Sequence, residues 1–259
     1  MLDIEDIQLS FGGVKALSGV TVNAETGMIT SVIGPNGAGK TSLFNVISGF
    51  YRPQKGRVTL AGEDISSLKP HQRAYRGMAR TFQNIALFHG MTVADNIKLG
   101  AHTHLKSGIL SAGLRLPSTR NEEANLDKEA DEIIDLLELD KVRNDQVEDL
   151  AYGLQKRVEM ARALIMRPKI LLLDEPVAGM NREEKSEMSR FVLRVKNDLN
   201  TTVLLIEHDM SMVMGISDAI VVLSFGQPIA SGTPDEVRNN PDVIKAYLGS
   251  VDETTQNAA

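Results

Sequence analysis

Apolar runs, glycine-rich turns and amphipathic segments alternate along this chain, and their order predicts a mixed α/β fold. Between residues 1 and 27, short apolar stretches separated by Gly12, Gly13 and Gly27 indicate antiparallel strands. The longest later runs are apolar throughout, which is typical of parallel strands buried on both faces of a sheet. Further strands are predicted at 28–32, 56–62, 170–173, 203–206 and 219–223.

Helical spacing dominates a central segment, about 84–168, which we predict to be a helical subdomain inserted into the α/β core. Its clearest helix carries regularly spaced apolar residues on an acidic background: Leu126, Ala130, Ile133, Ile134 and Leu137. Gly153 opens another helix, which we expect to run to Pro168. Residues 101–121 contain glycines and a proline, so we predict a loop-like insertion there.

Capping patterns mark the start of two later helices. Asn181 and Glu184 have the spacing of a capping box. The helix that follows is expected to bury Met188, Phe191, Val192 and Val195. Thr233 followed by Pro234 begins the second helix, because proline suits the first helical position. A further helix is expected over about 41–48, and a frayed tail over about 250–259.

Two sets of side chains are interpreted as structural. Arg73, Arg76 and Arg80 have spacings that favour one face of a helix within 71–82, so we expect a solvated basic face. Apolar packing is expected for a second set, since methionine fills irregular gaps in cores. That set is Met210, Met212 and Met214.

Composition narrows the class of protein. The 259 residues are 42% hydrophobic and 24% charged, which suits a globular protein with a sizeable core. The absence of cysteine excludes disulfides and thiolate metal sites. A net charge of −6 argues against nucleic acid as the main ligand, so no nucleic-acid partner is expected. An acidic N-terminus and the lack of a span-length apolar run favour a cytoplasmic location.

A glycine-rich segment directly behind the 28–32 strand carries the clearest chemistry. It fits the pattern G-x-x-x-x-G-K-[ST] and reads Gly34, Pro35, Asn36, Gly37, Ala38, Gly39, Lys40, Thr41 and Ser42. The glycines allow the backbone N–H groups to surround a β-phosphate at the N-terminus of the following helix. Lys40 would then contact the β- and γ-phosphate oxygens, and Thr41 would ligate Mg²⁺. We therefore predict a nucleoside triphosphate site.

Two adjacent acids follow the buried strand at 170–173. Asp174 suits coordination of Mg²⁺, directly or through water, and Glu175 suits orientation or deprotonation of a water molecule. Because ligands bind at the carboxyl ends of parallel strands, this position favours function over simple solvation.

Two further residues have alternative interpretations on sequence grounds alone. Phe11, beside Gly12, would stack on a purine or pack in the core. His208 follows the strand at 203–206, so it would contact a γ-phosphate or serve a structural role.

Taken together, these motifs resemble the ATP-binding-cassette (ABC) ATPases over nearly the whole chain. The resemblance implies one nucleotide-binding domain over 1–259, with a P-loop NTPase core, an N-terminal antiparallel β subdomain and an inserted helical subdomain. It implies that Gln83, Glu175 and His208 act in hydrolysis and that Thr41, Gln83 and Asp174 hold Mg²⁺. By the same resemblance Phe11 stacks on adenine, and the signature residues Ala151, Tyr152 and Gly153 bind ATP.

A narrower likeness is carried by seven segments, which look like the ATPase subunits of branched-chain amino-acid importers. They are Arg80 to Asn84, Leu87–Phe88, Met91 to Val93, Leu150 to Gly153, Ala178 to Asn181, Ile206 to Met210 and Ala246 to Gly249. This likeness implies partners: integral-membrane permease subunits, a second ABC ATPase subunit, and indirectly a solute-binding protein. It also implies attachment to the inner face of the cell membrane through the permeases. Some members of the group serve other small polar solutes such as urea.

Two motifs depart from the common family pattern, since the signature, usually L-S-G-G-Q, here consists of Leu150, Ala151, Tyr152, Gly153 and Leu154, and the D-loop carries Asn181. Ala151 stands where a signature serine would contact a γ-phosphate across a dimer, although the Gly153 amide remains available. Asn181 replaces the usual aspartate of the D-loop, the segment 178–181.

The function expected from these features is ATP hydrolysis coupled to transport by a head-to-tail ATPase dimer. Two rivals remain. A non-transport ABC protein acting on ribosomes or DNA would normally have two cassettes or a long coiled coil. A nucleotide-gated switch without useful hydrolysis would be expected to lack Glu175.

Overall fold

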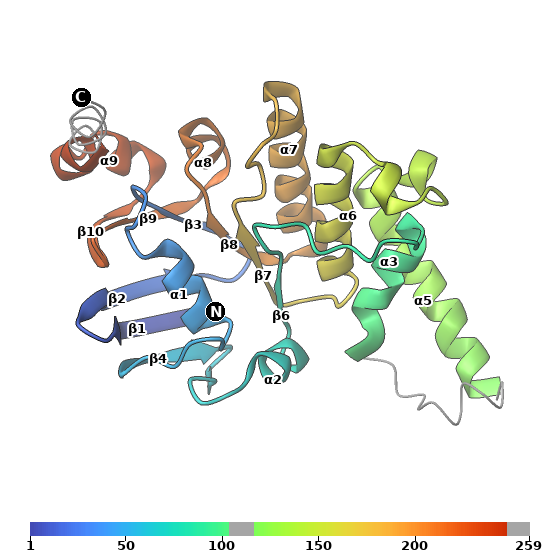
Figure 1. The fold of residues 1–259 in the computed structure, drawn as a ribbon, viewed down its shortest axis with the longest axis horizontal. Coiled ribbons are helices and arrows are strands. Elements are labelled where there is room, and N and C mark those ends of the chain that lie inside the picture. The colour runs from blue at the N-terminus through green and yellow to red at the C-terminus, as the bar shows by residue number, and fades with distance from the viewer. Residues whose placement is uncertain (104–116, 248–259) are drawn as a thin grey trace.

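The computed structural model describes residues 1–103 and 117–247, in which two sheets lie beside a separate group of helices (Figure 1). The smaller sheet has the strand order β2-β1-β4-β5, and all of its pairings are antiparallel. Its strands are β1 (Leu2–Phe11), β2 (Val14–Ala24), β4 (Lys55–Leu60) and β5 (Glu63–Asp64). This sheet confirms the antiparallel strands predicted ahead of the main sheet.

The larger sheet has the order β10-β9-β3-β8-β7-β6, and five of its strands are parallel. Only β10 runs antiparallel, paired with β9 at the edge. The strands are β3 (Ile29–Ile33), β6 (Met78–Arg80), β7 (Ile170–Asp174), β8 (Thr202–Ile206), β9 (Ala219–Ser224) and β10 (Gln227–Gly232). Because β3, β6, β7 and β8 run the same way, their carboxyl ends meet at one edge, where the predicted chemistry lies.

Strand β7 divides two hydrophobic cores by simple alternation. Ile170 and Leu172 face the core shared with α1 and the small sheet. Leu171 and Leu173 face the core shared with the helical group. Every residue of β7 is buried, and its sequence is apolar from Ile170 to Leu173 because both faces of the strand are covered.

The helices fall into two groups. Three of them, α3, α5 and α6, pack on one another at the right of Figure 1, where α6 also contacts β6, and the other helices form the second group. The bounds are α1 (Lys40–Ile47), α2 (Pro70–Tyr75), α3 (Val93–Leu99), α5 (Pro117–Leu136), α6 (Tyr152–Leu164), α7 (Arg182–Leu199), α8 (Met210–Ile216) and α9 (Pro234–Arg238). Short 3-10 turns are η1 (Gly100–Thr103), η2 (Asp140–Val142) and η3 (Val147–Asp149). Residues 241–247 are also helical.

The predicted capping patterns are confirmed. Asn181 and Glu184 form a reciprocal capping box at the start of α7, and Thr233 with Glu236 does the same for α9. Helix α7 buries the four predicted residues, Met188, Phe191, Val192 and Val195.

The prediction of a solvated arginine face within 71–82 is wrong. Helix α2 ends at Tyr75, and the chain turns through Gly77 into β6, so the arginines share no helix face. Arg73 is fully buried, and its guanidinium donates to carbonyl oxygens of Val46 and Ile47 at the C-terminus of α1. Burial lowers the pKa of Arg73 to about 10. Buried backbone carbonyls, which periodicity does not show, determine the position of this side chain.

Two predicted segments fall partly or wholly outside the described residues. Most of the insertion at 101–121 lies there, although α5 already begins at Pro117 and so ends the predicted loop early. The predicted tail at 250–259 lies wholly outside. Within 1–103 and 117–247, no helix combines the length and the apolar character that crossing a bilayer requires.

Candidate functional site

The segment between β3 and α1 forms a glycine-rich loop whose shape depends on two glycines. Gly34 has φ 151°, and a Cβ there would lie 2.1 Å from the carbonyl oxygen of Leu223. Gly39 has φ 97°, and a Cβ there would lie 2.7 Å from the carbonyl oxygen of Ala16. No other residue type fits at these positions without displacing backbone. The loop is therefore packed tightly against β2 and β9 before any ligand arrives.

Lys40 is folded back onto this loop. Its Nζ donates to the carbonyl oxygens of Gly34 and Pro35 at 2.6 and 3.1 Å, and the side chain is buried. Burial lowers the pKa of Lys40, while the charges of Glu175 and Asp174 act in the opposite direction. An anion that offered stronger acceptors than these carbonyls would draw the ammonium group away from the loop.

The first turn of α1 is open to an anion. Its N-cap is Gly39, which provides no side-chain acceptor, so the N–H groups of the first turn lack the usual cap. No acidic residue lies in that turn. An anion such as a phosphate group satisfies both the N–H donors and the helix dipole.

The three residues predicted to act in hydrolysis lie together, although they follow three different strands. Gln83 Nε2 donates to Glu175 Oε2 at 2.9 Å. His208 Nδ1 lies 3.9 Å from Glu175 Oε1. Glu175 itself has φ 49°, and its N–H donates to the carbonyl oxygen of Ile206 at 2.9 Å. The strained left-handed turn directly after β7 thus directs this carboxylate toward the ends of β6 and β8.

Sequence reasoning missed Glu207, which shapes the turn that carries His208. The Glu207 carboxylate is fully buried and accepts from the N–H groups of Val177, His208 and Asp209 at 3.0, 2.9 and 3.1 Å. These charge-assisted bonds join the turn after β8 to the segment after β7. A carboxylate at the end of an apolar strand was the available signal for this role.

Asp174 ends β7 in a buried position. Its Oδ2 accepts from Arg80 at 2.8 Å, and the two side chains are only 6% and 8% exposed. Arg80, which the sequence assigned to a solvated face, is thus the partner of the predicted metal carboxylate. No periodic pattern connects these two residues, since strand pairing between β6 and β7 brings them together.

A cavity of about 440 Å³ lies over the loop. The predicted residues Asn36 to Ser42 and Glu175 line it, together with Val14, Lys15, Ala16 and Phe225. Phe225, which sequence reasoning missed, is 84% exposed in the turn between β9 and β10. The neighbouring Gly226 N–H donates to the Ala38 carbonyl oxygen, so this turn supports the loop.

Phe11 lies at the end of β1 with 48% of its surface exposed. Its ring contacts Tyr51 edge to face, with centroids 5.1 Å apart. The alternative that Phe11 packs in the core is therefore wrong, and stacking on a purine stays a prediction.

The signature residues Ala151, Tyr152 and Gly153 lie outside the cavity over the glycine-rich loop. Tyr152 begins α6, and Ala151 is its N-cap. A Cβ on Gly153 would meet Glu184 Oε1 at 2.8 Å, so this segment packs against the start of α7. There Asn181 accepts from the Glu184 N–H, a capping role that asparagine fills as well as aspartate.

Helix α6 holds the segment around Gln83 through buried charges. Lys156 Nζ donates to the carbonyl oxygens of Phe82 and Gln83 at 3.2 and 2.8 Å, and Glu159 accepts from the Phe82 N–H at 3.2 Å. Lys156 and Glu159 also pair with each other. Burial raises the pKa of Glu159, and the Lys156 charge opposes that shift.

One turn further along α6, Arg162 donates to the Ala86 carbonyl oxygen at 2.5 Å. We call Lys156, Glu159 and Arg162 the α6 clamp.

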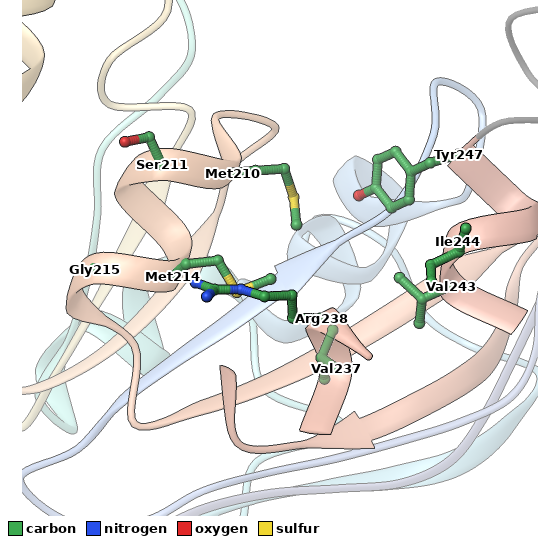
Figure 2. A pocket seen from close by; sticks show the side chains of 9 residues that line it. All are labelled: Met210, Ser211, Met214, Gly215, Val237, Arg238, Val243, Ile244 and Tyr247. Atoms are coloured by element: carbon green, nitrogen blue, oxygen red, sulfur yellow. The ribbon is translucent and has the colours of Figure 1, made fainter. Parts of the chain in front are cut away.

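A second cavity, of about 650 Å³, lies between α8 and the C-terminal helices (Figure 2). Met210 and Met214 line it opposite Tyr247 and pack against a hydrophobic core, and Met212 is buried, so the apolar packing predicted for these methionines is confirmed. Burial raises the pKa of Tyr247 to about 12, and a hydrogen bond with the Gly34 backbone acts in the opposite direction. The C-terminal helix therefore touches the start of the glycine-rich loop.

The donors at the site suit Mg²⁺ bound together with phosphates. Within the described residues, no three His, Cys, Asp or Glu side chains gather in a way that would hold a metal alone. Thr41, Asp174 and Gln83 instead offer oxygen donors, and Mg²⁺ commonly takes one or two protein ligands plus substrate phosphates and water. The residues present therefore fit a metal that arrives with a nucleotide.

Two family models match the chain. Residues 17–178 match the ABC transporter family, and residues 227–253 match the branched-chain amino acid ATP-binding cassette transporter family.

Known proteins and solved structures give similar matches over nearly full length. The chain is 44% identical over 249 residues to the high-affinity branched-chain amino acid transport ATP-binding protein BraF of Pseudomonas aeruginosa, covering 96% of this chain and 98% of BraF. The protein of the same description from Escherichia coli, LivG, matches with the same identity and coverage. Among solved structures, the ATP-binding cassette MJ1267 of an ABC transporter, in its ADP conformation, has a TM-score of 0.83 and 33% identity, covering 96% of this chain and 98% of that one.

Proposed function

The chain belongs to the ABC transporter family of ATPases, and from that premise we propose that it powers the import of branched-chain amino acids across the cytoplasmic membrane. The predicted fold class is confirmed, and ATP hydrolysis is the activity of the family. The proposal on cargo is carried by one observation, the 44% identity to BraF and LivG over 96% of the chain. The match of residues 227–253 to the branched-chain amino acid family supports it.

We propose that the glycine-rich loop binds the phosphates of ATP, with Thr41, Asp174 and Gln83 holding Mg²⁺. When bound, Mg²⁺ neutralises charge on the phosphate oxygens. Lys40 exchanges its two carbonyl acceptors for phosphate oxygens, and the uncapped N–H groups of α1 donate to the β-phosphate. The β9–β10 turn keeps the loop in shape during this exchange.

Glu175 is proposed to accept a proton from the attacking water. Its side chain is only 19% exposed, which limits competition from bulk solvent. The Gln83 amide fixes one carboxylate oxygen, and the other faces His208. His208 is 56% exposed, so it is free to turn toward a γ-phosphate. The protein thus contributes positioning and charge rather than a covalent step.

We propose that a second ATPase subunit completes the site. Ala151, Tyr152 and Gly153 lie at the N-terminus of α6, away from the cavity that holds Lys40 and Glu175. In a head-to-tail pair this N-terminus would face the γ-phosphate bound by the partner, where the Gly153 N–H and the helix dipole favour an anion. Tyr152 is 43% exposed, as expected of a residue that contacts the second subunit only in the dimer.

The surface proposed for the permease is a groove of about 680 Å³ between β6, α2 and α6, which we call the aromatic groove. Three exposed phenylalanines line it: Phe50, Phe82 and Phe88. Exposed aromatic side chains gathered in one groove are typical of a protein interface. Phe82 directly precedes Gln83, so a permease segment in this groove would lie one residue from the catalytic glutamine. This attachment would place the chain on the cytoplasmic face of the membrane.

The experiment that tests the function is reconstitution of the chain with permease and solute-binding subunits in proteoliposomes. We expect ATP-dependent uptake of leucine, isoleucine and valine, co-purification with the permeases, and loss of uptake in Lys40→Ala. Uptake of urea or another polar solute without branched-chain amino acids would overturn the cargo. Failure to associate with any integral-membrane subunit would overturn the transport function and favour a non-transport ABC protein.

A further inference from the structure

Arg80 is the buried cation that pairs with the carboxylate of Asp174, and none of the steps proposed for hydrolysis uses it. It ends β6, the edge strand of the large sheet, and pairs with Leu172 of β7. From there its Nη2 donates to Asp174 Oδ2 at 2.8 Å. One oxygen of the carboxylate is thereby occupied, and Asp174 Oδ1 has no protein partner among the described residues.

The guanidinium is fixed from a second direction by α1. Arg80 Nη1 donates to Asn45 Oδ1 at 2.9 Å and to Ser48 Oγ at 2.7 Å. Its Nε is buried and has no acceptor within the described part of the chain. A planar fork is needed to reach β7 and α1 at once, and the ammonium of a lysine provides no such geometry. Arg80 therefore joins the helix that follows the phosphate loop to the strand that ends in Asp174.

Aromatic rings surround the same guanidinium. The Cζ of Arg80 lies 5.0 Å from the ring centroid of Phe82, 5.6 Å from Phe44 and 5.9 Å from Phe50. These distances are within the range of cation–π attraction. Phe82 and Phe50 are 40% and 54% exposed in the aromatic groove, whereas Phe44 is buried. The group that orients Asp174 thus contacts side chains of an open surface.

We propose that Arg80 is a positioning residue for the metal site: it orients Asp174 so that Oδ1 is directed to Mg²⁺, and the rings of the aromatic groove hold it in place. This inference rests on the proposed placement of Mg²⁺ at Asp174. A partner of a metal ligand typically changes metal affinity by roughly 10- to 100-fold when it is removed. A purely structural ion pair would instead change stability and leave the linkage between metal and nucleotide intact.

The test is the ratio between the affinity for a non-hydrolysable ATP analogue in Mg²⁺ and that in EDTA, measured by calorimetry. We expect Arg80→Met to lower this ratio roughly tenfold while affinity in EDTA stays unchanged. Arg80→Lys should give an intermediate ratio, and it carries the test if the Met variant does not fold. An unchanged ratio in the folded variant would overturn the proposal.

Two controls separate this inference from the assumption behind it. Asp174→Asn should also lower the ratio, and if it does not, the proposed Mg²⁺ placement has failed together with the inference that rests on it. A ratio that falls in Asp174→Asn but not in Arg80→Met would overturn the role of Arg80 alone. Phe50→Leu should lower the ratio roughly two- to fivefold, because it removes a ring from Arg80. Phe88→Leu is the matched control, since Phe88 lines the same groove but contacts Arg162 instead. Equal ratios for these two variants would overturn the role of the groove.

Discussion

The glycine-rich loop and the α6 clamp both position residues of the proposed ATP site, but they do so by different physical means. In the loop, backbone conformation fixes the position of the chain. Only glycine at positions 34 and 39 allows the loop backbone to approach β9 and β2 so closely. In the clamp, buried charged side chains hold a distant backbone segment, as Lys156 does with the carbonyls of Phe82 and Gln83. The first arrangement is local in sequence and the second spans more than 70 residues. Both reach Glu175, which lines the cavity over the loop and accepts a hydrogen bond from Gln83.

The largest expected effect comes from Glu175→Gln, which separates hydrolysis from the ATP binding provided by the loop. Glu175→Gln keeps the shape of the side chain but removes the base, so turnover should fall by roughly 10²- to 10⁴-fold. ATP affinity should change little, because Lys40 and the loop are untouched. Steady-state hydrolysis together with equilibrium ATP binding measures both quantities. A variant that retains turnover would show that Glu175 is not the base.

Glu175→Gln also tests the proposal that a second subunit completes the site. ATP that binds without being consumed favours the closed dimer by mass action, so Glu175→Gln should move from 28.3 kDa to dimer mass with ATP and less with ADP. Adding Ala151→Ser restores the hydroxyl that the signature lacks and should strengthen this dimer. A mass that remains monomeric in both variants at saturating ATP would count against the head-to-tail arrangement.

The clamp should respond to mutation as a buried ionic network does. Lys156→Met removes the cation beside the buried Glu159 Oε2 and the donor to the carbonyl oxygens of Phe82 and Gln83, so we expect a loss of about 3–5 kcal/mol in the free energy of unfolding. Arg143→Met is the control, since the Arg143–Asp131 pair is exposed and should contribute under about 1 kcal/mol. Denaturant unfolding compares them. Equal losses of stability in Lys156→Met and Arg143→Met would mean that the buried clamp contributes no more to stability than an exposed ion pair.

These differences explain what could be predicted from sequence. The strands, the capping boxes and the loop depend on neighbours within a few residues, so their patterns could be recognised. Arg73 and Arg80 were misinterpreted because their partners, carbonyls of α1 and the carboxylate of Asp174, come from other elements. Glu207 and Phe225 were missed for the same reason, since the packing of turns from separate strands gives each its role.

A smaller effect on nucleotide affinity is expected from Phe11, the exposed aromatic residue at the end of β1. Phe11→Ala should weaken ATP affinity by roughly 1–3 kcal/mol, with little preference between ATP and GTP, because stacking involves the face of the base and not its hydrogen-bonding edge. Stability should hardly change, since the ring is half exposed. Calorimetric titration with both nucleotides measures the effect. An unaltered affinity would exclude Phe11 from the site.

The smallest effect concerns pH and the surface pair beside His208. A hydrogen bond from Lys185 lowers the pKa of Asp209, helped by the Met212 N–H. Because the folded pKa lies below the unfolded value, the ionised carboxylate stabilises the fold above the unfolded pKa, and this contribution is lost as pH falls through the folded pKa. Asp209→Asn should therefore cost about 0.5–1 kcal/mol at neutral pH and progressively less in acid. The free energy of unfolding of both proteins, measured as a function of pH, checks this. A stability difference between Asp209→Asn and wild type that stays constant down to acid pH would show that the ionised carboxylate is not its source.

The most direct test of the account is a structure of the Glu175→Gln variant with ATP and Mg²⁺. We predict that Lys40 Nζ leaves the carbonyl oxygens of Gly34 and Pro35 for phosphate oxygens, while Lys156 keeps its contacts with Phe82 and Gln83. That result would show a loop that exchanges partners and a clamp that does not. Lys40 remaining on the loop carbonyls with ATP bound, or Lys156 released from the segment around Gln83, would contradict the account.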